Sequence, residues 1–313
     1  MMKAITINRY GPLSEMHVHK LPIPDVGEND VLIEVHAAAV NPVDIAIRNG
    51  WLQQRIPHQF PLVLGWDVAG VVKAVGSSVS SLQVGDEVYS YPDLARNGTY
   101  ADYIAVNHRF VSHKPKNITF EEAASIPLVG TCAFRSLVEV GNIQEGQRVL
   151  ILGGSGGVGS FAIQLAKSYG THVVTTTSTK NIEFVKQLGA DEVIDYTNTE
   201  LSSYGGLFDI VFDAADRKPF EQSFDLVKKG GKIISVATFP NEEDLRRAAE
   251  KEISVQFLIS NPSTDILPKI SSLIESNKIK PVIGSVFSMD EAQKAHELSE
   301  TNHARGKIVL KMK

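Results

Sequence analysis

The sequence is very poor in cysteine, because Cys132 is the only one in 313 residues. A single thiol excludes a disulfide within the chain and any zinc site built from several cysteines. It is compatible with a reducing compartment, and we predict a cytoplasmic protein. Since a free cysteine behaves as a small hydrophobic residue, we interpret Cys132 as a buried helix residue rather than a reactive thiol.

The sequence also lacks long apolar runs and an excess of positive charge. No stretch approaches the roughly 18 apolar residues of a membrane-spanning helix, and the first residues lack the apolar core of a signal peptide. The formal net charge is -5 and the pI about 6.0. We therefore expect no nucleic-acid partner and no membrane partner. Because 313 residues exceed the size at which single cores stop growing, we expect two domains.

A glycine cluster follows a short apolar run near the middle of the chain. Val149–Leu152 is apolar throughout, as in a parallel strand buried on both faces, and apolar residues recur at helical spacing across Val158–Tyr169. Gly154, Gly156 and Gly159 match a GxGxxG motif, which is weak evidence alone. Between a strand and a helix, these glycines serve a tight turn, close approach of a pyrophosphate and close packing of helix on sheet.

The elements after this cluster continue an alternation of strands and helices. A strand at His172–Thr176, a helix at 181–188 and a strand at Glu192–Tyr196 complete a βαβαβ unit, and three more strands follow at 208–213, 232–237 and 253–259. This pattern predicts a dinucleotide-binding sheet. The alternative is an α/β domain whose glycine loop only turns the chain. The expected cofactor-binding residues of this sheet are Gly154, Ser155, Gly156, Gly157, Val158, Gly159, Ala214, Val236 and Phe257.

The acidic residue expected about 20 positions further on, which binds the ribose 2′-hydroxyl of NAD, is missing. Residues 175–180 read Thr-Thr-Thr-Ser-Thr-Lys instead. Hydroxyl groups and one cation suit a 2′-phosphate, which a carboxylate would repel. We therefore predict NADP(H), bound by Ser178, Lys180 and the phenol of Tyr196. The alternative for Lys180 is a solvated lysine at the start of a helix.

The residues before the glycine cluster predict a β domain. Val31–Ala37 alternates apolar and other residues, Val68–Val75 is a second strand, and Asn97–Gly98 is a hairpin signal. Thr119–Glu122 has the spacing of a capping box and starts a helix, which a second helical stretch follows at 130–140. We predict an α/β protein with domains at 1–117, 118–262 and 263–313. The last part contains a strand, Gly306–Leu310, that should return to the N-terminal sheet.

Eight segments, in this order and spacing, resemble the medium-chain dehydrogenase/reductase superfamily and its zinc-independent quinone oxidoreductase branch. They are residues 39–44, 64–70, 84–88, 98–101, 123–127, the glycine loop, 188–191 and 306–307. The resemblance implies a GroES-like β domain interrupted by an inserted Rossmann domain, with the active site in the cleft between them. It also implies a homodimer joined through Rossmann edge strands, for which 255–260 is the candidate.

The resemblance also bears on metal binding. Zinc-dependent members of the superfamily hold an ion with a cysteine and a histidine, and this chain has Asn41 and Trp66 at those places. An amide oxygen and an indole are poor zinc ligands. His17 and His19 share one side of a predicted strand but have no cysteine or carboxylate pair nearby. We predict no metal site.

Without zinc, hydride from C4 of nicotinamide must pass to an electron-poor acceptor, such as a quinone or an α,β-unsaturated carbonyl compound. The resemblance places Asn41 beside the nicotinamide, Asp44 nearby, and Thr131 within reach of it. The alternatives are a turn at Asn41, a structural role for Asp44 and a helix N-cap at Thr131. Arg48 is the remaining candidate catalytic residue, unless it is a solvated helix-end arginine.

Trp51 and Trp66 could form aromatic walls for flat acceptors, although core packing is the simpler interpretation of Trp66. Three functions stay open at this point. The first is an NADPH-dependent quinone reductase, with a 2-alkenal or enone reductase as its neighbour. The second is a nucleotide-binding sensor or binding module without turnover. The third is a zinc alcohol dehydrogenase, which Asn41, Trp66 and the single cysteine oppose.

Overall fold

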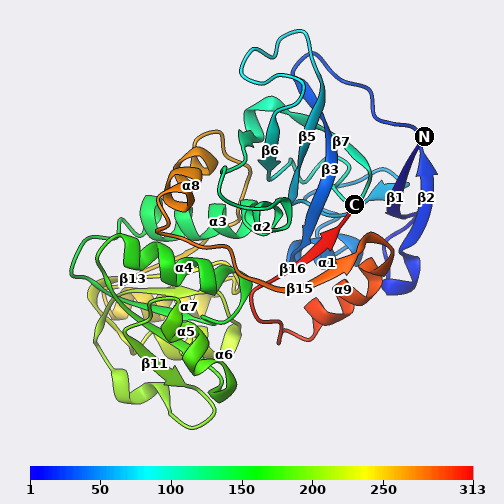
Figure 1. The fold of residues 1–313 in the computed structure, drawn as a ribbon. Coiled ribbons are helices and arrows are strands. Elements are labelled where there is room, and N and C mark those ends of the chain that lie inside the picture. Colours follow the sequence, from blue (N-terminus) through cyan, green and yellow to red (C-terminus); the bar gives the residue numbers. More distant parts are fainter. Residues whose placement is uncertain (313) are drawn as a thin grey trace. The chain divides into compact units, whose positions relative to one another are not determined.

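The computed structural model describes residues 1–312, which form two compact units (Figure 1). Unit 1 comprises Met1–Leu128, Asn261–Glu275 and Pro281–Lys313, and unit 2 comprises Val129–Ser260 and Ser276–Lys280. The predicted division differs at its first boundary, residue 117. Helix α2 (Phe120–Ala124) lies beyond that residue but packs on strands of unit 1, so the unit continues to Leu128.

Unit 1 is built on two sheets. Its three-stranded sheet has the order β2 (His17–Leu21), β1 (Met2–Ile7), β4 (Leu62–Val63). Its larger sheet has the order β15 (Ile283–Ser288), β16 (Lys307–Lys311), β3 (Asp30–Val40), β5 (Val68–Val75), β6 (Glu87–Ser90), β8 (Val111–His113), with β7 (Tyr103–Asn107) also paired to β3. Val31, Ile33 and Val35 are fully buried, as their alternation predicts.

Strand β16 returns to the N-terminal sheet, as predicted. It pairs antiparallel with β3, with Ile308 opposite Val40 and Leu310 opposite Ala38. Figure 1 shows this red strand beside the blue β3. The helices of unit 1 include α1 (Pro42–Arg48), α8 (Ile266–Glu275) and α9 (Ala292–Glu300). The last part of the chain therefore completes a core that the first part begins.

The hairpin predicted at Asn97–Gly98 is wrong. Gly98 N–H donates to Val63 O at 2.8 Å and Tyr100 N–H donates to Leu64 O at 2.9 Å. The Asn97 side chain accepts from Val63 N–H at 3.0 Å. Residues 97–100 therefore run beside the segment after β4, and the strand β7 begins only at Tyr103. A local turn signal cannot indicate such a distant backbone partner.

Unit 2 contains a sheet of six strands that all pair in parallel. The order is β11 (Glu192–Asp195), β10 (His172–Thr177), β9 (Arg148–Leu152), β12 (Phe208–Asp213), β13 (Val227–Ser235), β14 (Ser254–Phe257). The helices α4 (Gly157–Ser168), α5 (Ile182–Gln187), α6 (Arg217–Ser223) and α7 (Glu242–Glu250) connect them. Leu150, Val174 and Val211 have no exposed surface, as continuous apolar strands predict.

The helical stretch predicted at 130–140 begins earlier, as α3 (Pro127–Phe134), and continues as a π-helical segment, Arg135–Val140. Proline suits the first helical position, because its missing N–H would be unpaired there anyway. Thr131 lies inside α3, so the alternative role of an N-cap is wrong. The capping box predicted at Thr119 is present: Thr119 N–H donates to Glu122 Oε2 at 2.8 Å and its Oγ1 accepts from Glu122 N–H at 3.2 Å.

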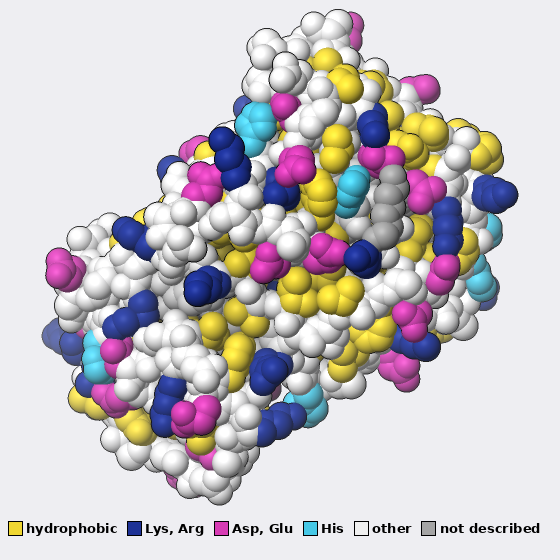
Figure 2. Space-filling view, viewed as in Figure 1, with side chains coloured by type: hydrophobic (Ala, Val, Ile, Leu, Met, Phe, Trp, Pro, Cys, Tyr) yellow, Lys and Arg dark blue, Asp and Glu magenta, His cyan; other side chains and the backbone are white. Residues whose placement is uncertain are grey.

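No helix in residues 1–312 is long and apolar enough to cross a membrane. On the face shown in Figure 2, acidic and basic side chains are intermixed. That distribution agrees with a net charge of only -5.

Candidate functional site

The glycine loop lies between strand β9 and helix α4. Gly153 has a φ of +80°, so this residue makes the tight turn, and not Gly154 as predicted. A Cβ atom on Gly159 would lie 2.2 Å from Gly153 O. Gly159 thus allows helix α4 to pack directly on the loop, whereas the prediction was close packing of the helix on the sheet.

The outer side of this loop is accessible. Ser155, Gly156, Gly157 and Val158 are half-buried. A Cβ atom on Gly156 would have only Gly153 O within 4 Å, at 3.5 Å. Gly156 is the N-cap of the 12-residue helix α4, and no side chain caps it. Free backbone N–H groups at a positive helix end suit a pyrophosphate, so these residues fit the predicted dinucleotide.

Three further predicted cofactor residues lie at the same edge of the sheet. Ala214 follows β12, Val236 follows β13, and Phe257 ends β14. Because the strands are parallel, their carboxyl ends meet at the edge that carries the glycine loop. The turn after β13 is fixed: Ser235 Oγ donates to the buried Asp213 at 2.6 Å and accepts from Thr238 N–H at 2.7 Å.

The residues predicted for the 2′-phosphate follow strands β10 and β11. Ser178 directly follows β10, and Lys180 lies in the 3₁₀ turn Thr179–Asn181. Lys180 is exposed and, within residues 1–312, makes no ion pair or hydrogen bond. Tyr196, directly after β11, is 53% exposed. Within residues 1–312, the side chains of Lys180 and Tyr196 make no hydrogen bond, and Ser178 Oγ accepts one from Asn181 Nδ2 at 3.4 Å. These polar groups remain accessible to a ligand.

Lys307 and Asp67 form a buried ion pair in unit 1, and the Asn41 amide hydrogen-bonds to both. Lys307 Nζ donates to Val40 O at 3.0 Å, Asn41 Oδ1 at 2.5 Å and Asp67 Oδ2 at 3.2 Å. Asn41 Nδ2 donates to Asp67 Oδ2 at 2.8 Å, and Asp67 Oδ1 accepts from Leu128 N–H at 2.7 Å. All three donors of the ammonium group thus have acceptors. The amide of Asn41 is committed to this pair at both ends.

Asp44 fixes the start of α1. Its Oδ2 accepts from Asn41 N–H at 2.9 Å and from Tyr100 Oη at 2.8 Å. Burial raises the pKa of Asp44 to about 7, although these hydrogen bonds oppose the rise. Asp44 Oδ1 is buried and has no hydrogen-bond partner within residues 1–312. The carboxyl group caps the helix, as the structural alternative predicts, and this leaves the Asn41 side chain free to bind Lys307.

A chain of hydrogen bonds leads from Asp44 to the surface. Arg48 is 2% exposed, and it donates to Gly11 O at 3.2 Å, to His296 Nδ1 at 3.2 Å and to Glu300. The alternative of a solvated helix-end arginine is therefore wrong. Because arginine only donates, His296 Nδ1 accepts, and Nε2 carries the proton that faces Tyr100 Oη at 3.3 Å. Burial lowers the pKa of His296 to about 3, which keeps the ring neutral.

Comparisons with known proteins agree with both units. Residues 27–116 match the family model described as alcohol dehydrogenase GroES-like domain, and residues 188–310 match the one described as zinc-binding dehydrogenase. A 2-methylene-furan-3-one reductase of Solanum lycopersicum is 37% identical over 99% of this chain and 79% of its own length. The chloroplastic NADPH-dependent alkenal/one oxidoreductase of Arabidopsis thaliana has the same identity and coverage.

Solved structures give the same result. The quinone oxidoreductase of Coxiella burnetii is 34% identical, with a TM-score of 0.91 over 100% of this chain and 99% of that one. The Escherichia coli quinone oxidoreductase complexed with NADPH is 25% identical, with a TM-score of 0.87 over 99% of this chain and 100% of that one. The chain belongs to the medium-chain dehydrogenase/reductase superfamily, in its quinone and alkenal/one oxidoreductase branch.

Membership confirms the predicted fold: unit 1 carries the GroES-like domain and unit 2 the Rossmann sheet. The protein is an NAD(P)H-dependent oxidoreductase of this group. Relatives are described as chloroplastic, and one from Danio rerio, 33% identical over 99% of this chain and 91% of its own length, as mitochondrial. The cytoplasmic location therefore stays a prediction.

The donor atoms of this oxidoreductase do not fit a catalytic zinc ion. The Asn41 amide is held by Lys307 and Asp67, and Trp66, which is fully buried, offers only an indole. His19 Nδ1 is 2.6 Å from the Thr6 hydroxyl group. Within residues 1–312, no group of three or more His, Cys, Asp or Glu side chains could hold a metal ion. Trp51 is 73% exposed, so it takes no part in the core.

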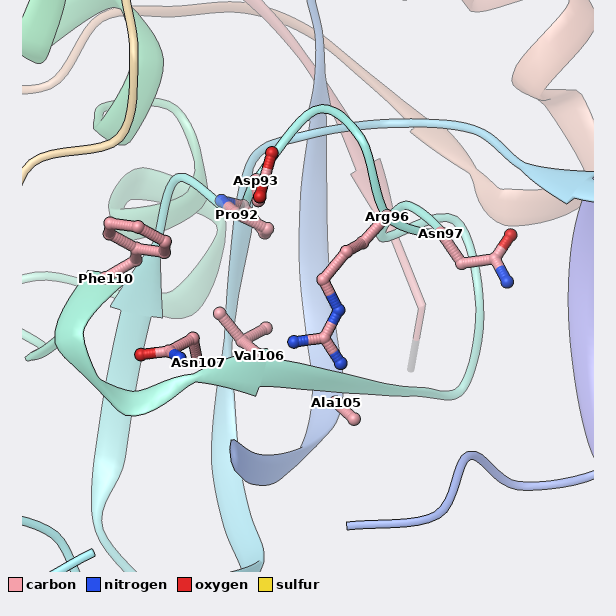
Figure 3. Close-up of a pocket in the computed structure, with 8 residues that line it drawn as sticks. All are labelled: Pro92, Asp93, Arg96, Asn97, Ala105, Val106, Asn107 and Phe110. Carbon is pink, nitrogen blue, oxygen red and sulfur yellow. The ribbon is translucent and has the colours of Figure 1, made fainter. Parts of the chain in front are cut away.

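A hollow in unit 1 lies outside the candidate site (Figure 3). Its lining residues are Pro92, Asp93, Arg96, Asn97, Ala105, Val106, Asn107 and Phe110. The Arg96 guanidinium pairs with both carboxylate oxygens of Asp30, at 2.8 Å each, and these hydrogen bonds hold the pKa of Asp30 below its usual range. Its charge is therefore already neutralised, and none of the predicted catalytic or cofactor residues lines the hollow.

The buried polar residues of unit 1 described above form one cluster, the buried cluster: Asn41, Asp44, Arg48, Asp67, Tyr100, His296 and Lys307. The sequence did not predict four of them, namely Asp67, Tyr100, His296 and Lys307. Three of them lie in segments that carried the family resemblance, at 64–70, 98–101 and 306–307. Their presence in those segments was the only available signal. His296 had none, because its role depends on helix α9 packing against α1.

Proposed function

We propose that this oxidoreductase transfers hydride from NADPH to quinones or related electron-poor carbonyl compounds, without zinc. The observation that carries the proposal is the pairing of Asn41 with Lys307 and Asp67 where zinc-dependent members place a ligand. Without a Lewis acid, the protein needs an acceptor that delocalises the negative charge arriving on its oxygen. Quinones and enones do so, whereas simple aldehydes do not.

In this proposal, bound NADPH supplies the hydride and the protein supplies binding and orientation. The glycine loop and the start of α4 bind the pyrophosphate. Ser178, Lys180 and Tyr196 bind the 2′-phosphate. Asn41 and Thr131 adjoin the nicotinamide ring. Since Lys307 and Asp67 hold the Asn41 amide, it acts as a fixed wall rather than a mobile donor, and the product takes its proton from solvent.

Enones are the second candidate acceptor class. The observation that favours them is the 37% identity to a 2-methylene-furan-3-one reductase and to an alkenal/one oxidoreductase, each across 99% of this chain. Both classes need the same hydride donor and the same charge delocalisation. A nucleotide-binding sensor without turnover stands as the alternative if no acceptor is reduced.

The decisive experiment follows NADPH oxidation at 340 nm by metal-free protein. The panel contains 1,4-benzoquinone, 9,10-phenanthrenequinone, an enal and a simple aldehyde. We expect oxidation with the quinones and none with the aldehyde, and the ratio of quinone to enal turnover selects the acceptor class. Tight NADPH binding without oxidation of any acceptor would favour the sensor. Turnover that depends on added zinc would contradict the proposal.

We also propose a homodimer joined through strand β14, the edge of the six-stranded sheet. Its outer backbone groups have no neighbouring strand within the described sheet, so they can pair with a second copy of the chain. Sedimentation equilibrium should give twice the 34.1 kDa mass of one chain. A mass of 34.1 kDa at micromolar concentration would exclude the dimer.

A further inference from the structure

A carboxylate lies beside the residues proposed for the 2′-phosphate. Strands β10 and β11 are neighbours, and Thr177 is the register partner of Asp195 at their carboxyl ends. Ser178 directly follows the first strand, Lys180 lies in the 3₁₀ turn after it, and Tyr196 directly follows the second strand. Asp195 is therefore at the sheet edge where the coenzyme ribose of a Rossmann domain binds.

Four hydrogen bonds fix this carboxylate. Its Oδ2 accepts from Thr179 Oγ1 at 2.6 Å and Asn198 Nδ2 at 2.8 Å. Its Oδ1 accepts from the Thr197 N–H at 3.0 Å and the Thr197 hydroxyl group at 2.6 Å. The hydrogen bond from Thr179, and then those from Thr197, lower the pKa of Asp195. The group is ionised at neutral pH, and these hydrogen bonds hold its orientation.

No cation neutralises Asp195. Within residues 1–312 it makes no ion pair, and Lys180 makes none either. All four hydrogen-bond donors of Asp195 are uncharged. The carboxyl ends of β10 and β11 therefore present one free cation, Lys180, and one fixed anion, Asp195, whose charges sum to zero. NADPH brings about two negative charges more than NADH, because the 2′-phosphate replaces a hydroxyl group.

We propose that Asp195 is a specificity-determining residue that opposes the 2′-phosphate, so that the protein accepts both NADPH and NADH with only a small preference. This inference rests on the 2′-phosphate site of the proposed function. Lys180 attracts the phosphate and Asp195 repels it, and the two effects partly cancel. Thr179 connects them, because its hydroxyl group ties the turn that carries Lys180 to the Asp195 carboxylate.

The test measures coenzyme dissociation constants by the fluorescence of bound NADPH and NADH, with no acceptor present. Asp195→Asn keeps a similar shape and removes the charge. For an exposed charge screened by water and salt, we expect the preference for NADPH over NADH to rise about twofold to fivefold. The change should come from NADPH, with NADH affinity nearly constant, and it should shrink as ionic strength rises.

Two further variants separate charge from geometry. Thr179→Val removes the hydroxyl group and leaves the carboxylate charged, so it should not increase the NADPH preference. Asp25→Asn removes an exposed charge in unit 1 and serves as the matched control, with no change expected. The inference is overturned if Asp195→Asn leaves the preference unchanged. It is also overturned if Asp195→Asn weakens NADPH binding, because Asp195 would then be a positioning residue.

A Lys180→Met variant distinguishes failure of this inference from failure of the proposed function. It should lower NADPH affinity and leave NADH affinity unchanged. If it changes neither, the 2′-phosphate binds elsewhere and the proposed site itself is wrong. If it lowers NADPH affinity while Asp195→Asn has no effect, the site stands and only the role of Asp195 fails.

Discussion

The buried cluster of unit 1 and the carboxyl edge of the unit 2 sheet use polar groups in opposite ways. In unit 1, the charged and amide groups of Asn41, Asp67 and Lys307 hydrogen-bond to one another, and each nitrogen of the Arg48 guanidinium donates to another part of the unit. At the sheet edge, Lys180 is uncommitted and the backbone of the glycine loop is accessible. The glycine loop and the alternation of strands and helices marked the sheet edge as functional, whereas only the family resemblance marked the residues of unit 1.

The difference separates two kinds of polar residue. Removing one partner of a buried ion pair destabilises the fold, because it leaves the other charge buried without compensation. An exposed group without a partner is available to a ligand, and its loss has little effect on folding. Substitutions in unit 1 should therefore change unfolding free energy, whereas substitutions at the sheet edge should change coenzyme affinity.

The largest effect is expected for Lys307→Met. The variant leaves Asp67 buried without its cation, which should lower the unfolding free energy by about 3 to 5 kcal/mol. Chemical denaturation measures this loss. Lys311→Met is the control, because Lys311 is exposed in its pair with Glu121 and should cost less than about 1 kcal/mol. If both variants lose the same unfolding free energy, the buried Lys307–Asp67 pair does not stabilise the fold more than an exposed pair does.

The second prediction concerns pH and Asp44. Burial raises the pKa of Asp44 from 3.8 to about 7 in the folded chain. The folded state therefore binds the proton more tightly than the unfolded state, and the resulting stabilisation is fully present below about pH 4. This stabilisation is lost as the pH rises to 7, and above about pH 7 the unfolding free energy no longer changes through Asp44. Relative to Asp44→Asn, the wild type should lose at most about 4 kcal/mol over this range.

Denaturation of both proteins at several pH values measures this difference. Asparagine can still accept from Asn41 N–H, so the cap of α1 is kept. If the difference in unfolding free energy does not change with pH, Asp44 is already ionised in the folded protein. If it increases with pH, the carboxylate is stabilised rather than destabilised by its surroundings.

A smaller effect, on affinity rather than stability, is expected for Lys180→Glu. Reversing this exposed charge should weaken NADPH binding about tenfold or more, because the 2′-phosphate loses a cation and meets a carboxylate. NADH affinity and the denaturation midpoint should be unchanged. Equal weakening of both coenzymes would place Lys180 outside the phosphate site, and a lower midpoint would show that Lys180 contributes to folding.

The smallest effect is expected for Tyr196→Phe. Loss of the phenolic hydroxyl group removes one hydrogen bond to the 2′-phosphate, which should weaken NADPH binding about threefold to tenfold. Fluorescence titration with both coenzymes measures it. Tyr204→Phe, in the same unit and away from these strand ends, is the matched control. An identical response in both variants would remove Tyr196 from the proposed site.

Local patterns predicted the elements well where neighbouring residues decide the structure. The strands at 68–75 and 208–213 have the predicted bounds, and the cap at Thr119 is present. The buried cluster could not be predicted, because Lys307 and Asn41 are 266 residues apart in the sequence. Arg48 illustrates the same limit: its position at a helix end left a catalytic role and a solvated side chain both open, and only the packing of α9 on α1 buries it.

The position of Lys307 in β16 has a consequence for synthesis on the ribosome. Asn41 emerges from the exit tunnel 266 residues before the side chain that completes its hydrogen bonds. The strands of unit 2 are continuous in sequence and are all made before β16. The nucleotide-binding unit can thus fold while the nascent chain is still growing, whereas unit 1 reaches its final core only after translation has passed β16.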